Sequence, residues 1–362
     1  MKSKPNWLKQ FHRPLVITGP CSAESELQMM KTAEQLDKNY IQVFRAGIWK
    51  PRTKPNSFEG VGAIGLKWLK KVKDEFGFIT ATEVANANHV KLAVENNVDW
   101  LWIGARSTVN PFTVQEIAEE LQNTDKVILV KNPVNPDLDL WLGAIERLQT
   151  QNIQNIGAIH RGFSTYKKTK YRNNPQWQIA LDFMNKAPNI PLICDPSHIC
   201  GNRDGIFEVA QQAYNFEYDG LMIESHCNPN EAWSDAKQQL KPEQLHEILK
   251  KIEIRKSGDK DAIYNSKLNR LRTEIDEADQ AILETLAQRM LISNQIGELK
   301  KDHNVAVFQP DRWKCILDTA MNQSQKLGLS EEFITQLIKA IHQESIQHQN
   351  TIMNQKAQTK SE

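Results

Sequence analysis

Four side chains in the first two thirds of the chain could bind a metal ion. They offer one sulfur, one imidazole nitrogen and two carboxylates: Cys21, His198, Glu224 and Asp235. This mixture suits a divalent transition metal better than calcium or magnesium, which prefer oxygen ligands. It does not select among manganese, iron, cobalt and zinc. We expect a divalent metal ion as cofactor.

Six basic residues in the same region predict a site for strongly anionic small molecules: Arg45, Lys50, Arg52, Arg106, Lys131 and Arg161. The guanidinium group can bind a phosphate or carboxylate through two hydrogen bonds at once. These cations are a local feature, because 45 Lys and Arg against 44 Asp and Glu leave a net charge of only +1. Bulk charge therefore gives no reason to expect nucleic-acid binding.

Eight short apolar runs alternate with amphipathic helical patterns from the N-terminus onward. The runs begin at Pro14, Tyr40, Phe76, Val98, Lys126, Asn155, Pro191 and Gly220. Eight strands, each followed by a helix, are what a closed (β/α)8 TIM barrel requires, and such barrels usually take about 250 residues. We predict an α/β fold with this barrel over residues 1–255. A doubly wound open sheet is the alternative architecture.

The residues that could do chemistry fall at the ends of these runs. In order, the ends carry Cys21, Arg45, Glu83, Arg106, Lys131, Arg161, Asp195 with His198, and Glu224. Taken singly, each has an ordinary structural explanation, since a lone cysteine is usually core filler and a lone arginine usually lies on the surface. Because the active site of a (β/α)8 barrel is built at the carboxyl ends of its strands, eight such ends predict one active site.

The character of the chain changes after residue 255. A polar linker is expected over 256–265, followed by a small all-α domain over 266–362. One helix of about 35 residues, or about 50 Å, is expected from Ser266 to Lys301, with further helices over about 311–326 and from 330 to the mid-350s. Steps of three and four residues place Arg272, Arg289 and Lys300 on one apolar seam. Buried cations need anionic partners, so a dicarboxylate ligand is one possibility.

Targeting and redox signals are weak. No apolar run approaches the roughly 20 residues of a membrane helix, and the start MKSKPNWLKQF has no apolar signal-peptide core. The five cysteines form no CxxC pair, which argues against a disulfide framework or a thiolate zinc site. We expect a cytoplasmic protein without membrane or nucleic-acid partners.

Short motifs of the first domain resemble the type I 3-deoxy-D-arabino-heptulosonate-7-phosphate (DAHP) synthases. They are GPCS at 19–22, FRAG at 44–47, KPRT at 50–53, GAR at 104–106, HRG at 160–162, DPSH at 195–198, and MIESH at 222–226 with SD at 234–235. That family condenses phosphoenolpyruvate with erythrose 4-phosphate in the first step of the shikimate pathway. The resemblance implies that the metal ligands are Cys21, His198, Glu224 and Asp235.

The same resemblance implies roles for the remaining residues of the barrel mouth. Those that would bind phosphoenolpyruvate are Arg106, Lys131 and Arg161, with Arg45 and Lys50 beside them. Those that would bind the aldose phosphate are Arg52 and Thr53, and Glu83 and Asp195 complete the substrate-binding set. Lys50 is either the proton donor or a purely electrostatic group. The related 3-deoxyoctulosonate-8-phosphate synthases, which take a pentose phosphate, are the alternative, and KPRT and Cys21 favour the tetrose enzyme.

The second domain is similar to the all-helical chorismate mutases. The matching positions are Arg272 in LNRLRTEID, Arg289 in AQR, Lys300 in GELK, Arg312 in DR, and Ser345 and Gln349 in ESIQHQ. That family rearranges chorismate to prephenate. The resemblance implies that the arginines bind carboxylates and that Lys300 and Gln349 serve the breaking ether oxygen. It also implies a homodimer or higher oligomer in which Arg272 enters the partner's site.

One departure from the mutase pattern leaves the function of this domain open. The usual acidic residues near Arg312 are replaced by Gln309 and Trp313, so the usual acceptor for the substrate hydroxyl is missing. The first interpretation is a bifunctional enzyme with both sites active. The alternative is a DAHP synthase whose weak helical domain serves for dimerisation and effector binding. In either case we expect prephenate to inhibit the synthase through this domain.

Overall fold

The computed structural model describes residues 5–11, 14–51, 56–166, 169–255, 258 and 261–355. The chain forms two compact units, Met1–Ser257 and Gly258–Glu362, each of which is described by itself below. In the described part of the chain, no helix has both the length and the apolar character needed to span a bilayer.

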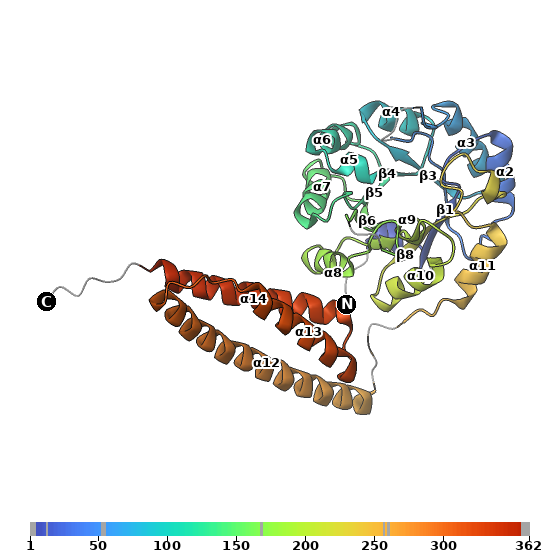
Figure 1. Ribbon diagram of the computed structural model, residues 1–362. Helices are drawn as coiled ribbons and strands as arrows, with labels where there is room; N and C mark the ends of the chain where they lie inside the picture. Colours follow the sequence, from blue (N-terminus) through green and yellow to red (C-terminus); the bar gives the residue numbers. More distant parts are fainter. Residues whose placement is uncertain are drawn as a thin grey trace. The chain divides into compact units, whose positions relative to one another are not determined.

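Eight parallel strands form the first unit's closed barrel (Figure 1). They are β1 (Leu15–Gly19), β2 (Val43–Arg45), β3 (Ile79–Val84), β4 (Trp100–Ile103), β5 (Val127–Lys131), β6 (Ile156–His160), β7 (Leu192–Cys194) and β8 (Gly220–Glu224). Each strand pairs with the next, and β1 pairs with β8 through the register Leu15 to Gly220, which closes the sheet. The predicted (β/α)8 barrel is confirmed, and the open-sheet alternative is wrong.

Helices surround the barrel (Figure 1). The elements are α1 (Asn6–Lys9), α2 (Glu26–Glu34), α3 (Ile64–Phe76), α4 (Ala87–Glu95), α5 (Ala105–Thr108), α6 (Pro111–Glu120), α7 (Leu138–Thr150), α8 (Trp177–Lys186), α9 (Pro196–Cys200), α10 (Ile206–Asn215), the 3-10 turn η1 (Pro229–Glu231) and α11 (Pro242–Lys251). The short helices α5 and α9 follow β4 and β7 directly, so they lie beside the carboxyl ends of the strands.

The barrel has two apolar layers, because alternate residues of a strand face opposite sides. Val16 of β1 belongs to the layer between strands and helices, whereas its neighbour Ile17 belongs to the layer inside the barrel. The helix α1 adds Trp7 to the inner layer, where its ring meets Trp100 edge to face at 5.2 Å between centroids. The barrel interior is therefore a packed core, and only its ends are open to polar chemistry.

Over residues 261–355 the second unit forms three helices: α12 (Ala262–Asp302), α13 (Pro310–Lys326) and α14 (Glu331–Asn354). The helix α12 begins four residues before the expected Ser266, because Asp261 accepts hydrogen bonds from the backbone N–H groups of Ile263 and Tyr264 and so caps it. The helix α14 contacts both α12 and α13. Gly297 permits the close approach of α12 and α14, since a Cβ there would lie 3.1 Å from the Cα of Gln349.

Candidate functional sites

The two-residue repeat of the strands directs the site residues into the barrel mouth. Ile193 and Met222 belong to the inner layer, and Asp195 and Glu224 follow two positions later, so their side chains face the same way. Four more charged residues also lie two positions after an inner-layer residue: Arg45, Glu83, Lys131 and Arg161. Strand alternation thus brings charged groups from six strands together at one end of the barrel.

Three of the four predicted metal ligands form a compact group. Donor atoms of Cys21, Glu224 and Asp235 all lie within 4.8 Å of one another. The Cys21 thiol donates to Asp235 Oδ2 at 3.3 Å. Glu224 is fully buried, and among the described residues nothing hydrogen-bonds its Oε1 atom. An unsatisfied buried carboxylate oxygen beside a sulfur and a second carboxylate fits a divalent transition metal.

The fourth predicted ligand, His198, lies beside this group. Its Nε2 atom is 3.7 Å from Glu224 Oε1, but His198 is not among the three donors that are all within 4.8 Å. Its Nδ1 atom lies 2.8 Å from a carboxylate oxygen of Asp195, which also caps α9 by accepting from the His198 N–H. A carboxylate on one ring nitrogen orients the other nitrogen, as is usual for metal-binding histidines.

The ionisable groups of the mouth influence one another strongly. Burial, followed by the charge of Glu224, raises the pKa of the Cys21 thiol to about 12. Burial alone would also raise the pKa of Asp195, but His198 and Lys131 outweigh this effect and hold it well below its usual range. Asp195 therefore carries a negative charge at neutral pH, which stabilises the adjacent cations.

Cations adjoin this candidate metal site. Lys50 donates from Nζ to the Cys21 sulfur at 3.1 Å. Arg45 is buried, donates to the Cys21 carbonyl oxygen at 2.9 Å and has Nη1 3.3 Å from Glu224 Oε1. Lys131 is also buried, with its ammonium 2.8 Å from Asp195. Arg45 and Lys131 are thus paired with buried carboxylates, whereas Lys50 contacts a thiol and would stabilise an anionic ligand.

The remaining described cations differ in exposure, since Arg161 is partly buried and Arg106 is exposed. Arg161 donates to Asn173 Oδ1 at 2.8 Å, and burial lowers its pKa to about 10, so it stays charged at neutral pH. Arg106 lies exposed in α5. Arg52 and Thr53, predicted to bind the aldose phosphate, lie outside the described residues.

Trp102 is a site residue that the sequence analysis did not single out. The Arg45 guanidinium lies 4.7 Å and the Lys131 ammonium 5.8 Å from its ring centroid, and its indole N–H donates to Glu83 at 3.2 Å. Gly104 leaves room for this Glu83 carboxylate, since a Cβ there would lie 2.1 Å from Oε1. The inward alternation that follows Trp100 could have identified Trp102.

A loop network missed by the sequence analysis holds the two carboxylates of the candidate metal site. Arg172 pairs with Asp235 at 2.8 Å and donates to Gln238 at 2.9 Å. Gln238 in turn donates to Glu224 Oε2 at 2.7 Å. Arg172 lies outside the strands and helices, so no periodic pattern in the sequence could have indicated these contacts.

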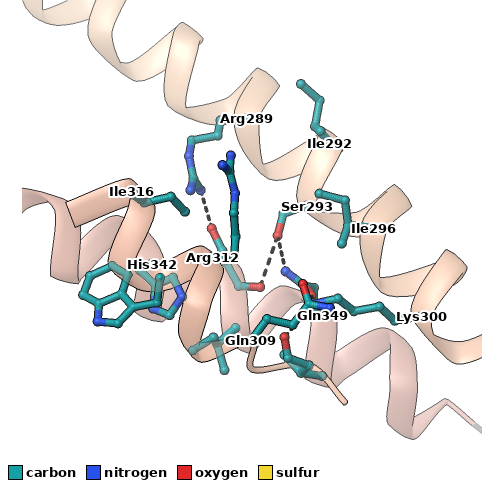
Figure 2. Close-up of a pocket in the computed structure, with 14 residues that line it drawn as sticks. Arg289, Ile292, Ser293, Ile296, Lys300, Gln309, Arg312, Ile316, His342 and Gln349 are labelled. Atoms are coloured by element: carbon teal, nitrogen blue, oxygen red, sulfur yellow. Dashed lines mark hydrogen bonds between the residues drawn. The ribbon is translucent and has the colours of Figure 1, made fainter. Parts of the chain in front are cut away.

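The helical unit contains a pocket of about 420 Å³ that opens among its three helices (Figure 2). Five of the six predicted chorismate-site residues line it: Arg289, Lys300, Arg312, Ser345 and Gln349. The sixth, Arg272, is exposed on α12 and does not line the pocket. A single chain therefore assembles most of the predicted site but not all of it.

The polar groups of the pocket are partly linked to one another. Lys300 donates to Gln349 Oε1 at 3.0 Å, and Gln349 donates to Ser293 at 3.2 Å. Arg289 donates to the Ser345 hydroxyl. No Asp or Glu is found among the residues described as lining this pocket, so its cations have no carboxylate partner there. Such a wall suits a ligand with more than one negative charge.

The positions that depart from the mutase pattern also belong to the pocket. Gln309 lies exposed at the start of α13, and Trp313 follows one turn later. The Trp313 ring lies against His342 from α14 in a tilted arrangement, with centroids 4.1 Å apart and planes 32° apart. An aromatic pair thus occupies the part of the wall where a carboxylate was expected.

Comparisons with known proteins identify a family for each of the two units. Residues 10–257 match the model of the DAHP synthetase I family, and residues 271–350 match that of chorismate mutase type II. The chain is 30% identical over 237 residues to the phospho-2-dehydro-3-deoxyheptonate aldolase of Thermotoga maritima, covering 66% of this chain and 68% of the relative. It is 29% identical over 265 residues to the 2-dehydro-3-deoxyphosphooctonate aldolase of Geobacter sulfurreducens, covering 66% and 92%.

Solved structures support the same grouping. The crystal structure of the Thermotoga maritima DAHP synthase matches with a TM-score of 0.60 and 28% identity, over 66% of this chain and 67% of that one. A truncated form of the enzyme from the same organism matches with a TM-score of 0.57 and 27% identity, over 65% and 84%. The fold and mouth define a (β/α)8 barrel built for anionic substrates. The chain belongs to the DAHP synthetase I family and carries a chorismate mutase type II domain after the barrel.

Proposed function

We propose that the barrel condenses phosphoenolpyruvate with erythrose 4-phosphate, with a divalent metal held by Cys21, Glu224, Asp235 and His198. The observation that carries this proposal is the group of three donors within 4.8 Å, which includes the buried Glu224 with an oxygen that accepts no hydrogen bond from the described residues, and which has cations against it. The presence of both a DAHP synthase and a chorismate mutase domain supports a bifunctional shikimate-pathway enzyme.

The side chains at the mouth suit each part of this reaction. A divalent ion bound there would act as a Lewis acid toward the aldehyde group. Arg106, Lys131 and Arg161 would hold the phosphate and carboxylate of phosphoenolpyruvate, so that its C3 atom faces the aldehyde carbon. A bond forms between these two carbons, water adds at C2 of phosphoenolpyruvate, and phosphate leaves. Lys50, 3.1 Å from the Cys21 sulfur, would supply the proton for the new hydroxyl group or act as a purely electrostatic group.

The acceptor sugar distinguishes this proposal from its nearest alternative. The relatives include both heptonate and octonate aldolases, so the barrel alone is compatible with a tetrose or a pentose phosphate. We expect condensation with erythrose 4-phosphate and little or none with arabinose 5-phosphate. Product formation measured with each acceptor at equal concentration tests this, and a preference for the pentose would overturn the assignment.

We further propose that the helical unit rearranges chorismate to prephenate. Its pocket contains three cations and, among its described lining residues, no carboxylate, which suits a dicarboxylate substrate. The arginines Arg289 and Arg312 would bind the carboxylates, while Lys300 and Gln349 would stabilise charge on the breaking ether oxygen. Loss of chorismate absorbance with the full-length chain tests this. No loss would leave the domain as an effector-binding and dimerisation module.

A second copy of the chain would complete the pocket. Arg272 is exposed on α12, and the neighbouring Ile275 and Ile282 are 60% and 56% exposed. Long helices of this kind can cross those of a second copy and bury such residues. We propose a homodimer through α12 in which each Arg272 enters the partner's pocket. Sedimentation of the full-length chain would reveal a monomer if this is wrong.

The domain fusion also suggests regulation. We propose that prephenate bound in the helical pocket inhibits the synthase, since a ligand that favours one state of the chain changes the activity of the linked barrel. Synthase rates with and without saturating prephenate test this. Equal rates would overturn the regulatory proposal and leave both catalytic proposals unaffected.

A further inference from the structure

The helical pocket contains a histidine to which neither its sequence motifs nor the mutase resemblance assigns a role. His342 lies three residues before Ser345 and seven before Gln349 on α14. Residues at this spacing share one face of a helix, and all three line the pocket (Figure 2). The imidazole is half-buried and therefore belongs to the binding surface.

Two aromatic side chains hold this imidazole in place. The Trp313 ring lies against it, tilted by 32° with centroids 4.1 Å apart, and Phe308 meets it edge to face at 6.0 Å and 73°. Over residues 261–355, no hydrogen bond to the His342 ring is found. The ring plane is thus set by packing, and its two nitrogens are left available to a ligand.

His342 is uncharged near neutral pH and can therefore accept a hydrogen bond from a neutral group of the ligand. Partial burial, followed by the positive charges of Arg289 and Lys300, lowers its pKa. The facing side chains of α12 and α13 within the pocket add Arg312 and no carboxylate. Near neutral pH the ring is therefore uncharged, with one nitrogen that accepts a hydrogen bond and one that donates.

Two other acceptors in the pocket already accept a hydrogen bond. The Ser345 hydroxyl accepts from Arg289, and Gln349 Oε1 accepts from Lys300 at 3.0 Å. Gln309 lies exposed at the rim. A ligand hydroxyl buried without an acceptor would lose the hydrogen bond it makes in water. His342 is the acceptor that packing has oriented and left unused.

We propose that His342, held against Trp313, accepts a hydrogen bond from the ring hydroxyl of the dicarboxylate ligand and makes the pocket select ligands that carry this hydroxyl. This inference rests on the proposed function of the helical unit, because it takes chorismate and prephenate as the ligands. The imidazole and indole would together replace the carboxylate that is missing at positions 309 and 313.

The test compares chorismate with an analogue that has hydrogen in place of the ring hydroxyl, using the full-length chain. His342→Leu should lower kcat/KM for chorismate by about 10- to 100-fold, as expected when a hydrogen-bonding partner is lost. The same substitution should leave the value for the analogue nearly unchanged. His342→Asn, which keeps an acceptor, should recover part of the loss.

His348→Leu is the matched control, because His348 lies on the same helix but does not line the pocket. It should retain the values of the unmodified chain for both ligands. Equal losses for chorismate and the analogue in His342→Leu, or no loss for chorismate, would overturn the proposal. Circular dichroism of each variant separates a local effect from unfolding.

Calorimetric binding of prephenate separates this inference from the proposed mutase activity. A chain that binds prephenate but does not consume chorismate would overturn the catalytic proposal alone. Weaker prephenate binding by His342→Leu would then still support the role of His342, and equal binding would overturn it. A chain that binds neither compound would overturn both.

Discussion

The barrel mouth and the helical pocket both gather positive charge, but they neutralise it differently. In the barrel, buried Lys131 lies 2.8 Å from Asp195 and buried Arg45 lies 3.3 Å from Glu224. In the pocket, no carboxylate is found among the described lining residues. The first site is held in place by its own ion pairs before any substrate arrives, whereas the second needs its ligand as the counter-ion.

The supporting elements explain this difference. Strands fix the direction of each side chain at the mouth, and the closed sheet brings six strand ends together within one chain. The pocket is built from the faces of three helices, and one predicted member, Arg272, lies outside it. We therefore expect the barrel site to be sensitive to metal and the helical site to be sensitive to its cations and to a second chain.

The largest effect should follow loss of the metal. Cys21→Ala or dialysis against a chelator should lower synthase activity by about 1,000-fold or more, because Lewis-acid stabilisation is worth several kcal/mol. Adding manganese, iron, cobalt or zinc to the stripped protein should restore activity, and the best of them identifies the preferred ion. Mutase activity should not change, because the metal is assigned to the barrel alone. A loss of mutase activity together with synthase activity would contradict this assignment.

Removal of one pocket cation should have the next largest effect. Arg289→Ala should lower mutase activity by about 100- to 1,000-fold, the usual loss when one charge-stabilising donor is removed. Synthase activity measured without prephenate serves as the control and should persist. A mutase rate within a factor of about three of the unmodified chain would contradict the assigned role of Arg289.

Mixing two inactive variants tests whether a second chain contributes Arg272 to the helical pocket. Arg272→Ala and Arg289→Ala should each lack mutase activity, yet their mixed dimers should contain one intact site. If chains pair at random after co-expression, about a quarter of the unmodified activity should return. Recovery requires Arg272 and Arg289 of one site to come from different chains, so its absence would mean that each pocket uses its own Arg272.

The smallest predicted effect concerns barrel stability and pH. Burial, followed by the charge of Arg161, lowers the pKa of His160 to about 4. The hydrogen bond to the Pro175 carbonyl and the charge of Asp195 oppose this shift. The Tyr218 hydroxyl lies 2.8 Å from the other ring nitrogen. Because the unfolded chain binds this proton more readily, the stability contributed by neutral His160 is present above about pH 6.5 and decreases as the pH falls toward 4.

Between pH 7.5 and 5.5 the free energy of unfolding should decrease by about 1 kcal/mol through His160. Urea denaturation followed by tryptophan fluorescence measures this, since Trp141 and Trp177 lie beside the imidazole. His160→Gln cannot gain the charge and should show a shallower pH dependence. The same slope in both proteins would assign the effect to other groups.

Much of the barrel and its site could be predicted from local periodicity. The alternation of apolar runs with helical patterns identified the eight-stranded closed sheet, because each pattern reflects which side of an element is buried. The same alternation indicated the strand-end side chains, of which Asp195 and Glu224 are buried in the mouth. The heptad seam likewise indicated Arg289 and Lys300, both of which line the pocket.

The tertiary structure decided which of these side chains meet. Sequence alone could not show that His198 lies beside, and not within, the group of donors 4.8 Å across, nor that Arg272 remains exposed. It gave no indication of the contact between Arg172 and Asp235 or of the contact between the rings of Trp313 and His342. The physical reason is that periodicity records the direction of a side chain within its own element, whereas distances between elements depend on how the core packs them together.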